Sequence, residues 1–207
     1  MRKRALWKKT AAILLTAAII FSAAGCGTEN PEDQAAKIND TVITKGQFDR
    51  FSTLCLYMMG YDPSENLTSD QETSMLDDMV NAEVLKQYYE KEDPSVFSDT
   101  YQSGLEAFIS QTKQVSGEFI ESSGISDEDL TFYYMSQYLT QLCFNEIQAE
   151  NSDEELYGEA EKYYEEHRDD FGEETLDEAL EEIYYQLYSD RYEEKLDELK
   201  EDMSIEK

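Results

Sequence analysis

Ala36-Lys-Ile-Asn-Asp-Thr-Val-Ile43 consists of two short runs of strand-forming residues around the pair Asn39-Asp40. This pattern predicts a β-hairpin at the start of the folded domain, with Asn39-Asp40 as its turn. Thr44 follows directly and favours the capping of a helix N-terminus. A helix is expected next, because apolar residues recur at spacings of three and four: Phe48, Phe51, Cys55 and Met58. Gly60 and Pro63 are expected to end it.

The same helical spacing recurs along the rest of the chain. Five further helices are expected, over residues 69–92, 98–122, from 126, 152–171 and 175–202. The last would be about 40 Å long at 1.5 Å per residue, so we expect it to brace distant parts of the chain. Met203-Ser-Ile-Glu-Lys207 is predicted to return to the hairpin as a short strand. The fold class is therefore mainly α, with about six helices and a minimal β-sheet.

The composition is strongly acidic. The 207 residues include 47 Asp and Glu, 17 Lys and Arg and a single His. Five of the basic residues lie in the first nine positions, and the first acidic residue is Glu29. Without residues 1–25 the chain has 12 basic residues against 47 acidic ones, a net charge of −35. Such a surface argues against binding to nucleic acid or to anionic lipid through a basic patch.

Residues 1–25 have the pattern of an export signal. Positive charges in the first nine residues precede the apolar stretch 10–24, which is shorter than the roughly 20 residues of a membrane span. The stretch ends in Ser22-Ala-Ala-Gly-Cys26, which resembles a bacterial lipobox. We expect lipidation of Cys26, a polar tether over residues 26–35, and location at the extracytoplasmic face of a bacterial membrane. Ordinary secretion with an incidental cysteine is the alternative.

Few residues remain as candidates for catalysis, metal binding or disulfide formation. Cys55 and Cys143 lie on apolar helical stripes, and we expect buried thiols, although an exported protein allows a disulfide between them. No cluster of Cys and His is present that suits a zinc or redox site, so no metal or cofactor is predicted. His167 lies on an apolar stripe and has no recognisable Ser or Cys nucleophile motif, so no catalytic residue is assigned.

The order of these segments resembles that of the SurA/PrsA-type extracytoplasmic foldases. The resemblance covers residues 36–207 and rests on five pieces: the hairpin and helix start over 36–48, Leu76-Asp-Asp-Met-Val-Asn-Ala-Glu-Val-Leu85, Gly124-Ile-Ser-Asp-Glu-Asp-Leu130, residues 152–171, and residues 176–206. It implies a SurA N-terminal-like helical chaperone domain, related in kind to trigger factor.

One departure from these foldases concerns their catalytic domain. A parvulin prolyl isomerase domain commonly precedes the last helix, but here only Gly172-Glu-Glu174 separates Phe171 from Thr175. Parvulin-type sites also use a pair of histidines, and this chain has one. The resemblance therefore implies the chaperone part alone, not an enzyme.

Aromatic residues are the candidates for contact with client polypeptides. Four Tyr-Tyr doublets occur in predicted helices, and neighbouring helical residues point about 100° apart, so one ring of each pair can lie at the edge of the core. The client-contact candidates are Tyr89, Tyr133, Tyr164 and Tyr185. The alternative is that these rings only cover helix boundaries. The six methionines after residue 25 are expected in the core, with a client surface as the alternative.

The function expected from the resemblance is that of a holdase, a chaperone that binds unfolded or newly exported polypeptides without folding chemistry of its own. An adaptor lipoprotein that binds one dedicated envelope protein is the alternative. An enzyme with an unrecognised carboxylate site is disfavoured, because no nucleophile motif or phosphate loop is present.

Overall fold

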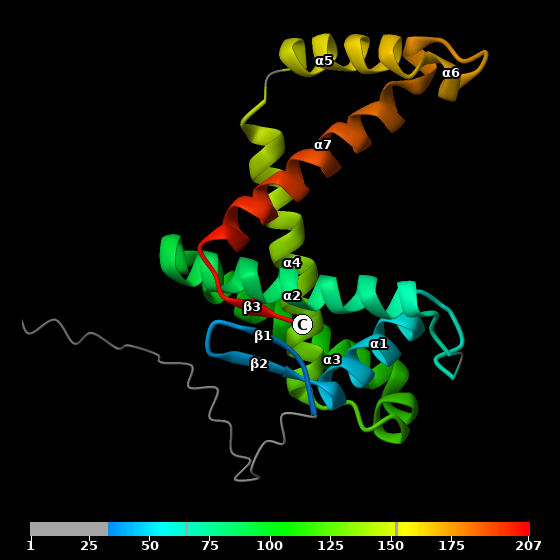
Figure 1. The fold of residues 1–207 in the computed structure, drawn as a ribbon. Helices are drawn as coiled ribbons and strands as arrows, with labels where there is room; N and C mark the ends of the chain where they lie inside the picture. The colour runs from blue at the N-terminus through cyan, green and yellow to red at the C-terminus, as the bar shows by residue number, and fades with distance from the viewer. Residues whose placement is uncertain (1–32, 65, 152) are drawn as a thin grey trace, which may run out of the picture. The chain divides into compact units, whose positions relative to one another are not determined.

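A computed structural model describes residues 33–64, 66–151 and 153–207 of the chain. The described residues form one compact unit, which is mainly helical with a small sheet (Figure 1). The predicted fold class is confirmed. The helices are α1 (Lys45–Met58), α2 (Ser69–Glu92), α3 (Asp99–Ser122), α4 (Asp127–Ala149), α5 (Asp153–Glu166), α6 (Arg168–Phe171) and α7 (Leu176–Glu201), with a 3-10 turn, η2, at Pro94–Phe97.

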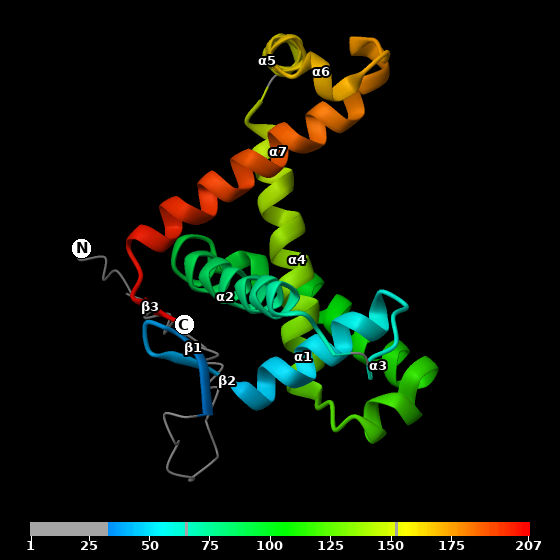
Figure 2. The same cartoon turned by 45° about the vertical axis from the view of Figure 1, so that its right-hand side comes forward.

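The sheet joins both ends of the folded unit. Strands β1 (Gln34–Ile38) and β2 (Thr41–Thr44) form the predicted hairpin, and β3 (Ile205–Glu206) pairs with the other edge of β1, so the order is β2-β1-β3. Both pairings are antiparallel, with Ile38 opposite Thr41 on one side and Ile205 on the other. The two views of the chain show β3 beside β1 (Figure 2). The predicted return of the C-terminal strand is therefore confirmed.

Asn39 in the hairpin turn connects this sheet to α2. Its φ of 53° lies in the left-handed region, which Asn tolerates better than most residues. The Asn39 main-chain N–H donates to the Ser204 carbonyl oxygen (2.8 Å), and Asn39 Oδ1 accepts from the Ser204 N–H (3.0 Å). Asn39 Nδ2 donates to Gln87 Oε1 of α2 (2.7 Å). One turn residue therefore holds the C-terminal strand and a helix together.

Most helices begin where a short polar side chain caps them. Thr44, Thr68, Ser126 and Thr175 each form a capping box, in which the cap and the side chain three residues on satisfy each other's main-chain N–H groups. Their partners are Gln47, Gln71, Asp129 and Glu178. These contacts are local in sequence, so the starts of α1, α2, α4 and α7 agree with the prediction to within one residue.

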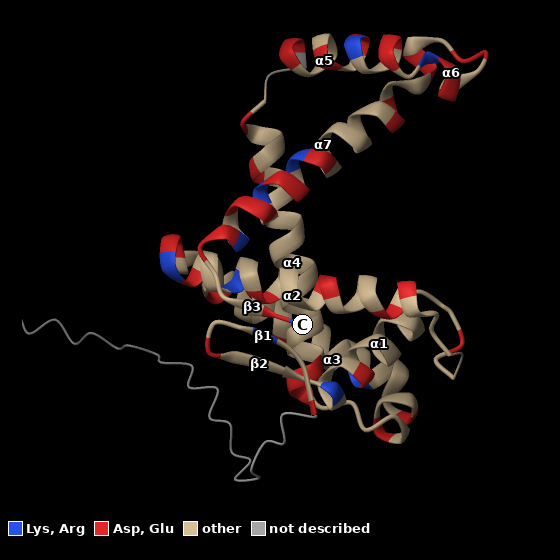
Figure 3. Cartoon of the chain, in the orientation of Figure 1, with Lys and Arg blue, Asp and Glu red and all other residues tan. Residues whose placement is uncertain are grey.

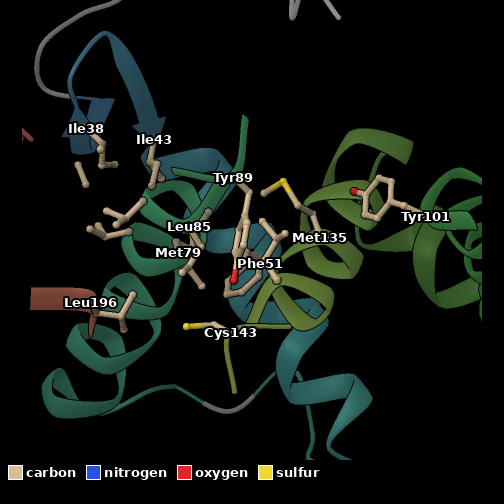
Figure 4. Close-up of a cluster of buried hydrophobic side chains, with 14 of the residues drawn as sticks. Ile38, Ile43, Phe51, Met79, Leu85, Tyr89, Tyr101, Met135, Cys143 and Leu196 are labelled. Carbon is tan, nitrogen blue, oxygen red and sulfur yellow. The ribbon is translucent and has the colours of Figure 1, made fainter. Parts of the chain in front are cut away.

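The main hydrophobic core lies between the sheet, α1, α2, α4 and the C-terminal half of α7 (Figure 4). Ile38 and Ile43 enter it from the hairpin, Tyr89 from α2, Cys143 from α4 and Leu196 from α7. A smaller cluster, made by Leu54, Ile120, Ile125 and Leu130, joins α1 to the end of α3 and the start of α4.

Helix α7 connects the main core to a separate cluster. Its N-terminal half buries Ala179 and Ile183 against Ala160 and Tyr164 of α5, whereas Leu196 packs in the main core. At 1.5 Å per residue its 26 residues span about 39 Å. The length of the helix is explained by these two separate packing partners.

The prediction of one continuous helix over residues 152–171 is wrong. The helix ends at Glu166, His167 adopts φ −118° and ψ 21°, and the short α6 follows. The chain must reverse here to enter α7, and Gly172, with φ 60°, makes the turn. The Tyr164 hydroxyl donates to the Glu174 main-chain oxygen and fixes this reversal. Helix α3 also departs from prediction, because it kinks at Ser116.

Replacement of Asn39 tests how much the turn contributes to stability. Asn39→Ala loses the side-chain bonds and strains the positive φ, so we expect a loss of about 1–3 kcal/mol in the free energy of unfolding. Asn39→Gly keeps the main-chain bond and tolerates the positive φ, so its loss should be smaller. Urea unfolding of both variants measures the difference. An unchanged midpoint for Asn39→Ala would mean that the side-chain bonds of Asn39 to Ser204 and Gln87 contribute nothing.

Candidate functional site

Among the described residues, large apolar side chains are exposed at the end of α1, on α5 and α7, and singly at Val115 of α3. The first, which we call the α1-end surface, consists of Met58, Met59 and Tyr61. The second is Tyr185 on α7, with Tyr157 of α5 also exposed. Isolated exposed apolar residues are ordinary in proteins, whereas three within four positions are more informative.

A helix-end motif positions the α1-end surface. Gly60, with φ 81°, donates its N–H to the Tyr57 oxygen (3.0 Å), and Tyr61 donates to the Leu56 oxygen (2.9 Å). This pair of bonds is the Schellman motif, which needs a residue with positive φ just after the helix. The motif fixes the direction in which the chain leaves α1. It therefore fixes the exposed positions of Met59 and Tyr61.

The same motif at the end of α3 has the opposite outcome. Gly124, with φ 65°, donates to Glu121 (3.3 Å), and Ile125 donates to Ile120 (3.1 Å). Ile125 is only 6% exposed and packs against Ile120, as is common for this motif, whereas Tyr61 in the equivalent position is 61% exposed. The α1-end surface is thus not a necessary result of ending a helix at glycine.

Tyr185 lies on a strongly acidic surface of α7. Its side chain is 71% exposed and shares a shallow depression with Glu174, Glu178, Glu181 and Glu182. Hydrogen bonds from the Thr175 main chain and hydroxyl lower the pKa of Glu178. Acidic residues recur along α5 and α7 (Figure 3). The depression therefore presents an aromatic ring within negative charge.

Two of the four predicted client-contact tyrosines lie in the interior. Tyr89 is 2% exposed and donates to Glu146 Oε2 (2.8 Å), and Tyr164 is buried with its hydroxyl bonded to Glu174. Each hydroxyl has a protein partner, which is the condition under which tyrosine is buried readily. The prediction that these two rings lie at the edge of the core is wrong. Tyr133 is half-buried beside Phe108 (ring centroids 5.9 Å apart), and only Tyr185 is largely exposed.

The α1-end surface was not singled out by the sequence pattern. Met58 completes an apolar stripe and was expected in the core with the other methionines, yet Met58 and Met59 are exposed, whereas Met79 and Met135 are buried. No sequence signal distinguishes them, because the same glycine helix end after α3 buries Ile125.

No cluster of three or more metal-ligating side chains occurs among the residues that the structure describes. The single histidine lies at the break between α5 and α6. His167 Nδ1 is 2.9 Å from the Tyr163 main-chain oxygen, and its ring stacks on that of Tyr163 at 4.1 Å between centroids. These local contacts fix the histidine at the chain reversal.

Cys55 and Cys143 are free thiols in the structure. Burial raises the pKa of Cys55 to about 12, with a further contribution from the charge of Asp78. Burial also raises the pKa of Cys143 to about 11, and the Glu146 carboxylate adds to the effect. Neither environment favours a thiolate, so neither cysteine has the character of a nucleophile.

The predicted lipidation site, Cys26, and the signal and tether segments before residue 33 lie outside the described residues. Among the helices that the structure describes, none combines the length and apolar character of a membrane span. Comparisons of the chain with protein-family models, curated proteins and solved structures find no match.

The two thiols predict a dependence of stability on pH. An unfolded thiol ionises near pH 8.5, whereas these thiols ionise near 11 and 12 when folded. As pH rises, thiolate therefore forms in the unfolded state before it forms in the folded state. The contribution of the two thiols to the free energy of unfolding should decline from about pH 8.5 toward 12. At about pH 8 Cys143 should react with a disulfide reagent only in urea. Rapid labelling of Cys143 in the folded chain would contradict its burial, whereas the partly buried Cys55 should react more slowly than a free thiol.

Proposed function

We propose that the chain is a lipid-anchored extracytoplasmic holdase of the SurA/PrsA-like type, without a prolyl isomerase site of its own. The observation that carries the proposal is the α1-end surface. Two methionines and a tyrosine are exposed there, and the tyrosine occupies a helix-end position at which the end of α3 buries Ile125. Methionine is flexible and polarisable, so it can adapt to clients of different shape.

The arrangement of elements supports the same proposal. The hairpin precedes the helices, and the chain closes through a long helix and a strand that pairs with β1. The connection between α6 and α7 consists of Gly172, Glu173, Glu174 and the cap Thr175. An isomerase domain at this position would need a long insertion, which this chain lacks.

The charge of the chain fits a holder of unfolded polypeptides. A net charge of −35 after residue 25, from 47 acidic and 12 basic residues, keeps the protein soluble despite its exposed apolar side chains. It also attracts cationic clients, which the acidic surface around Tyr185 can receive. Exposed apolar contact and surrounding negative charge are thus both available to a client.

Suppression of client aggregation tests the holdase proposal. Residues 27–207 should suppress the aggregation of a chemically unfolded basic protein at a few-fold molar excess. The triple replacement Met58→Ser, Met59→Ser and Tyr61→Ser should raise the amount of chain needed by about threefold or more, because it removes apolar contact area. Light scattering measures the effect across a salt series. Val115→Ser is the matched control, because Val115 is isolated and 76% exposed.

Each outcome of this experiment assigns a role. Equal suppression by the triple variant would exclude the α1-end surface as the client site. Absence of suppression by the unmodified chain would overturn the holdase proposal and favour the adaptor, whose mark would be one stable envelope partner in pull-downs. Turnover of a proline-containing peptide by the purified chain would contradict the absence of isomerase activity.

Replacement of the predicted lipidation site tests the anchor. Cys26→Ser removes the thiol that would carry the lipid, so the protein should leave the membrane fraction and appear in the soluble fraction. Fractionation followed by immunoblotting measures the distribution. Cys55→Ser is the control, because Cys55 lies within the folded unit, and it should stay with the membrane. Retention of the Cys26→Ser chain on the membrane would contradict lipidation at this residue.

A further inference from the structure

The α1-end surface contains two methionines on consecutive positions. Met58 is 40% exposed and Met59 is 57% exposed. The other methionines that the structure describes are half-buried or buried, and they are Met75, Met203, Met79 and Met135. The thioether groups of the folded unit therefore differ widely in their access to dissolved molecules. The two most accessible ones lie within the proposed client surface.

The end of α1 is anchored beneath these two side chains. Met58 is the last residue of the helix, and Met59 is its C-cap, whose main-chain N–H donates to the Cys55 oxygen (3.0 Å). The Tyr57 ring just before them stacks on Phe119 of α3, with 3.8 Å between the ring centroids. A polar group added to the two exposed side chains therefore leaves these anchoring contacts in place.

The two thiols of the folded unit do not compete for an oxidant. Thiolate is the form of cysteine that peroxides oxidise. Burial raises the pKa of Cys55 to about 12 and the pKa of Cys143 to about 11, so both thiols stay protonated at neutral pH. Oxidation of a thioether needs no deprotonation. Within the folded unit, the exposed methionines are therefore the sulfur groups most open to oxidation.

We propose that Met58 and Met59 form a reversible oxidation site that regulates client binding, which rests on the proposed holdase function. The oxidant is hydrogen peroxide. The methionine sulfur attacks one peroxide oxygen, so that an S–O bond forms while the O–O bond breaks. The second oxygen leaves as hydroxide and takes the proton of the transferred oxygen to become water. Sulfur loses two electrons and the peroxide gains them, and the product is methionine sulfoxide.

Oxidation removes the property that suits this surface to clients. A sulfoxide is polar, so the apolar area offered by Met58 and Met59 falls, while the ring of Tyr61 remains. Client binding is therefore weakened and not abolished. The fold is kept, because neither side chain belongs to the buried core, whereas a sulfoxide at Met79 or Met135 would place a polar group inside it.

Negative charge beside the site favours an uncharged oxidant over an anionic one. Asp62 follows Tyr61 directly, and its carboxylate accepts hydrogen bonds from the Ser64 hydroxyl (2.7 Å) and N–H (2.9 Å). These bonds lower the pKa of Asp62, so it is ionised at neutral pH. The net charge of −35 after residue 25, from 47 acidic and 12 basic residues, has the same sign. Anions such as hypochlorite are repelled, whereas hydrogen peroxide is neutral.

Peroxide treatment of the full chain in an uncharged detergent tests the site. Peptide mapping by mass spectrometry should show that Met58 and Met59 are oxidised about tenfold faster than Met79 and Met135. The thermal unfolding midpoint should stay unchanged at the dose that oxidises only the exposed pair. Equal rates for the two pairs, or oxidation of Cys55 before either pair, would overturn the site.

Client affinity before and after peroxide tests the regulation. The probe is a fluorescent basic polypeptide kept unfolded by reduction and alkylation, and fluorescence anisotropy measures its binding. Its affinity should fall about threefold after oxidation, and methionine sulfoxide reductases specific for the two sulfoxide epimers should restore it. Met58→Leu with Met59→Leu should bind equally before and after peroxide, whatever its starting affinity. Met75→Leu with Met203→Leu removes two less exposed methionines and should keep the peroxide response.

The outcomes separate this proposal from the proposed function. Selective oxidation of the exposed pair with unchanged client affinity would overturn the regulation and leave the holdase intact. A peroxide response that persists in the Met58→Leu and Met59→Leu chain would assign the response to other residues and overturn the site. Failure of the untreated chain to bind the client would refute the holdase and its regulation together, whereas faster oxidation of the exposed pair would still establish the modification site.

Discussion

The hydrogen bonds at Asn39 hold the two ends of the folded unit together. Its main chain and side chain bind Ser204, and its amide binds Gln87 of α2. Because Ser204 follows α7 by only a few residues, these bonds fix where the last helix ends. The N-terminal half of α7 packs against α5 through Ala179 and Ile183. The cluster between α5 and α7 is therefore also connected to the sheet through α7. One turn residue thus links the sheet, the main core and the long helix.

The elements that the sequence predicts well are those with local causes. Four helices begin at a capping residue that satisfies N–H groups within three residues, so each start depends only on neighbours in the sequence. The capping residues are Thr44, Thr68, Ser126 and Thr175. The break at His167 has a different origin. It depends on the reversal at Gly172 and on the bond from Tyr164 to the Glu174 main chain, ten residues away. Apolar periodicity continues through His167 and therefore predicts a continuous helix where tertiary contacts interrupt it.

The candidate site was harder to predict because periodicity reports an apolar face and not what covers it. Met58 and Val115 both complete helical stripes, yet both are exposed: Met58 lies at the last turn before Gly60, and Val115 lies beside the kink at Ser116. Tyr89 shows the opposite error, because it was expected at the edge of the core and is buried. A tyrosine suits either position, and the burial of this one depends on Glu146, which accepts the hydrogen bond of its hydroxyl.

The net charge of the chain and its individual contact surfaces act over different distances. At physiological ionic strength the Debye length is about 8 Å, so most of the 47 acidic residues are screened from a segment bound at any one place. The long-range field raises the rate of encounter with cationic chains, but it does not select among the segments of a client. Selection needs carboxylates next to the apolar contact area. Glu174, Glu178, Glu181 and Glu182 meet that condition around the exposed ring of Tyr185.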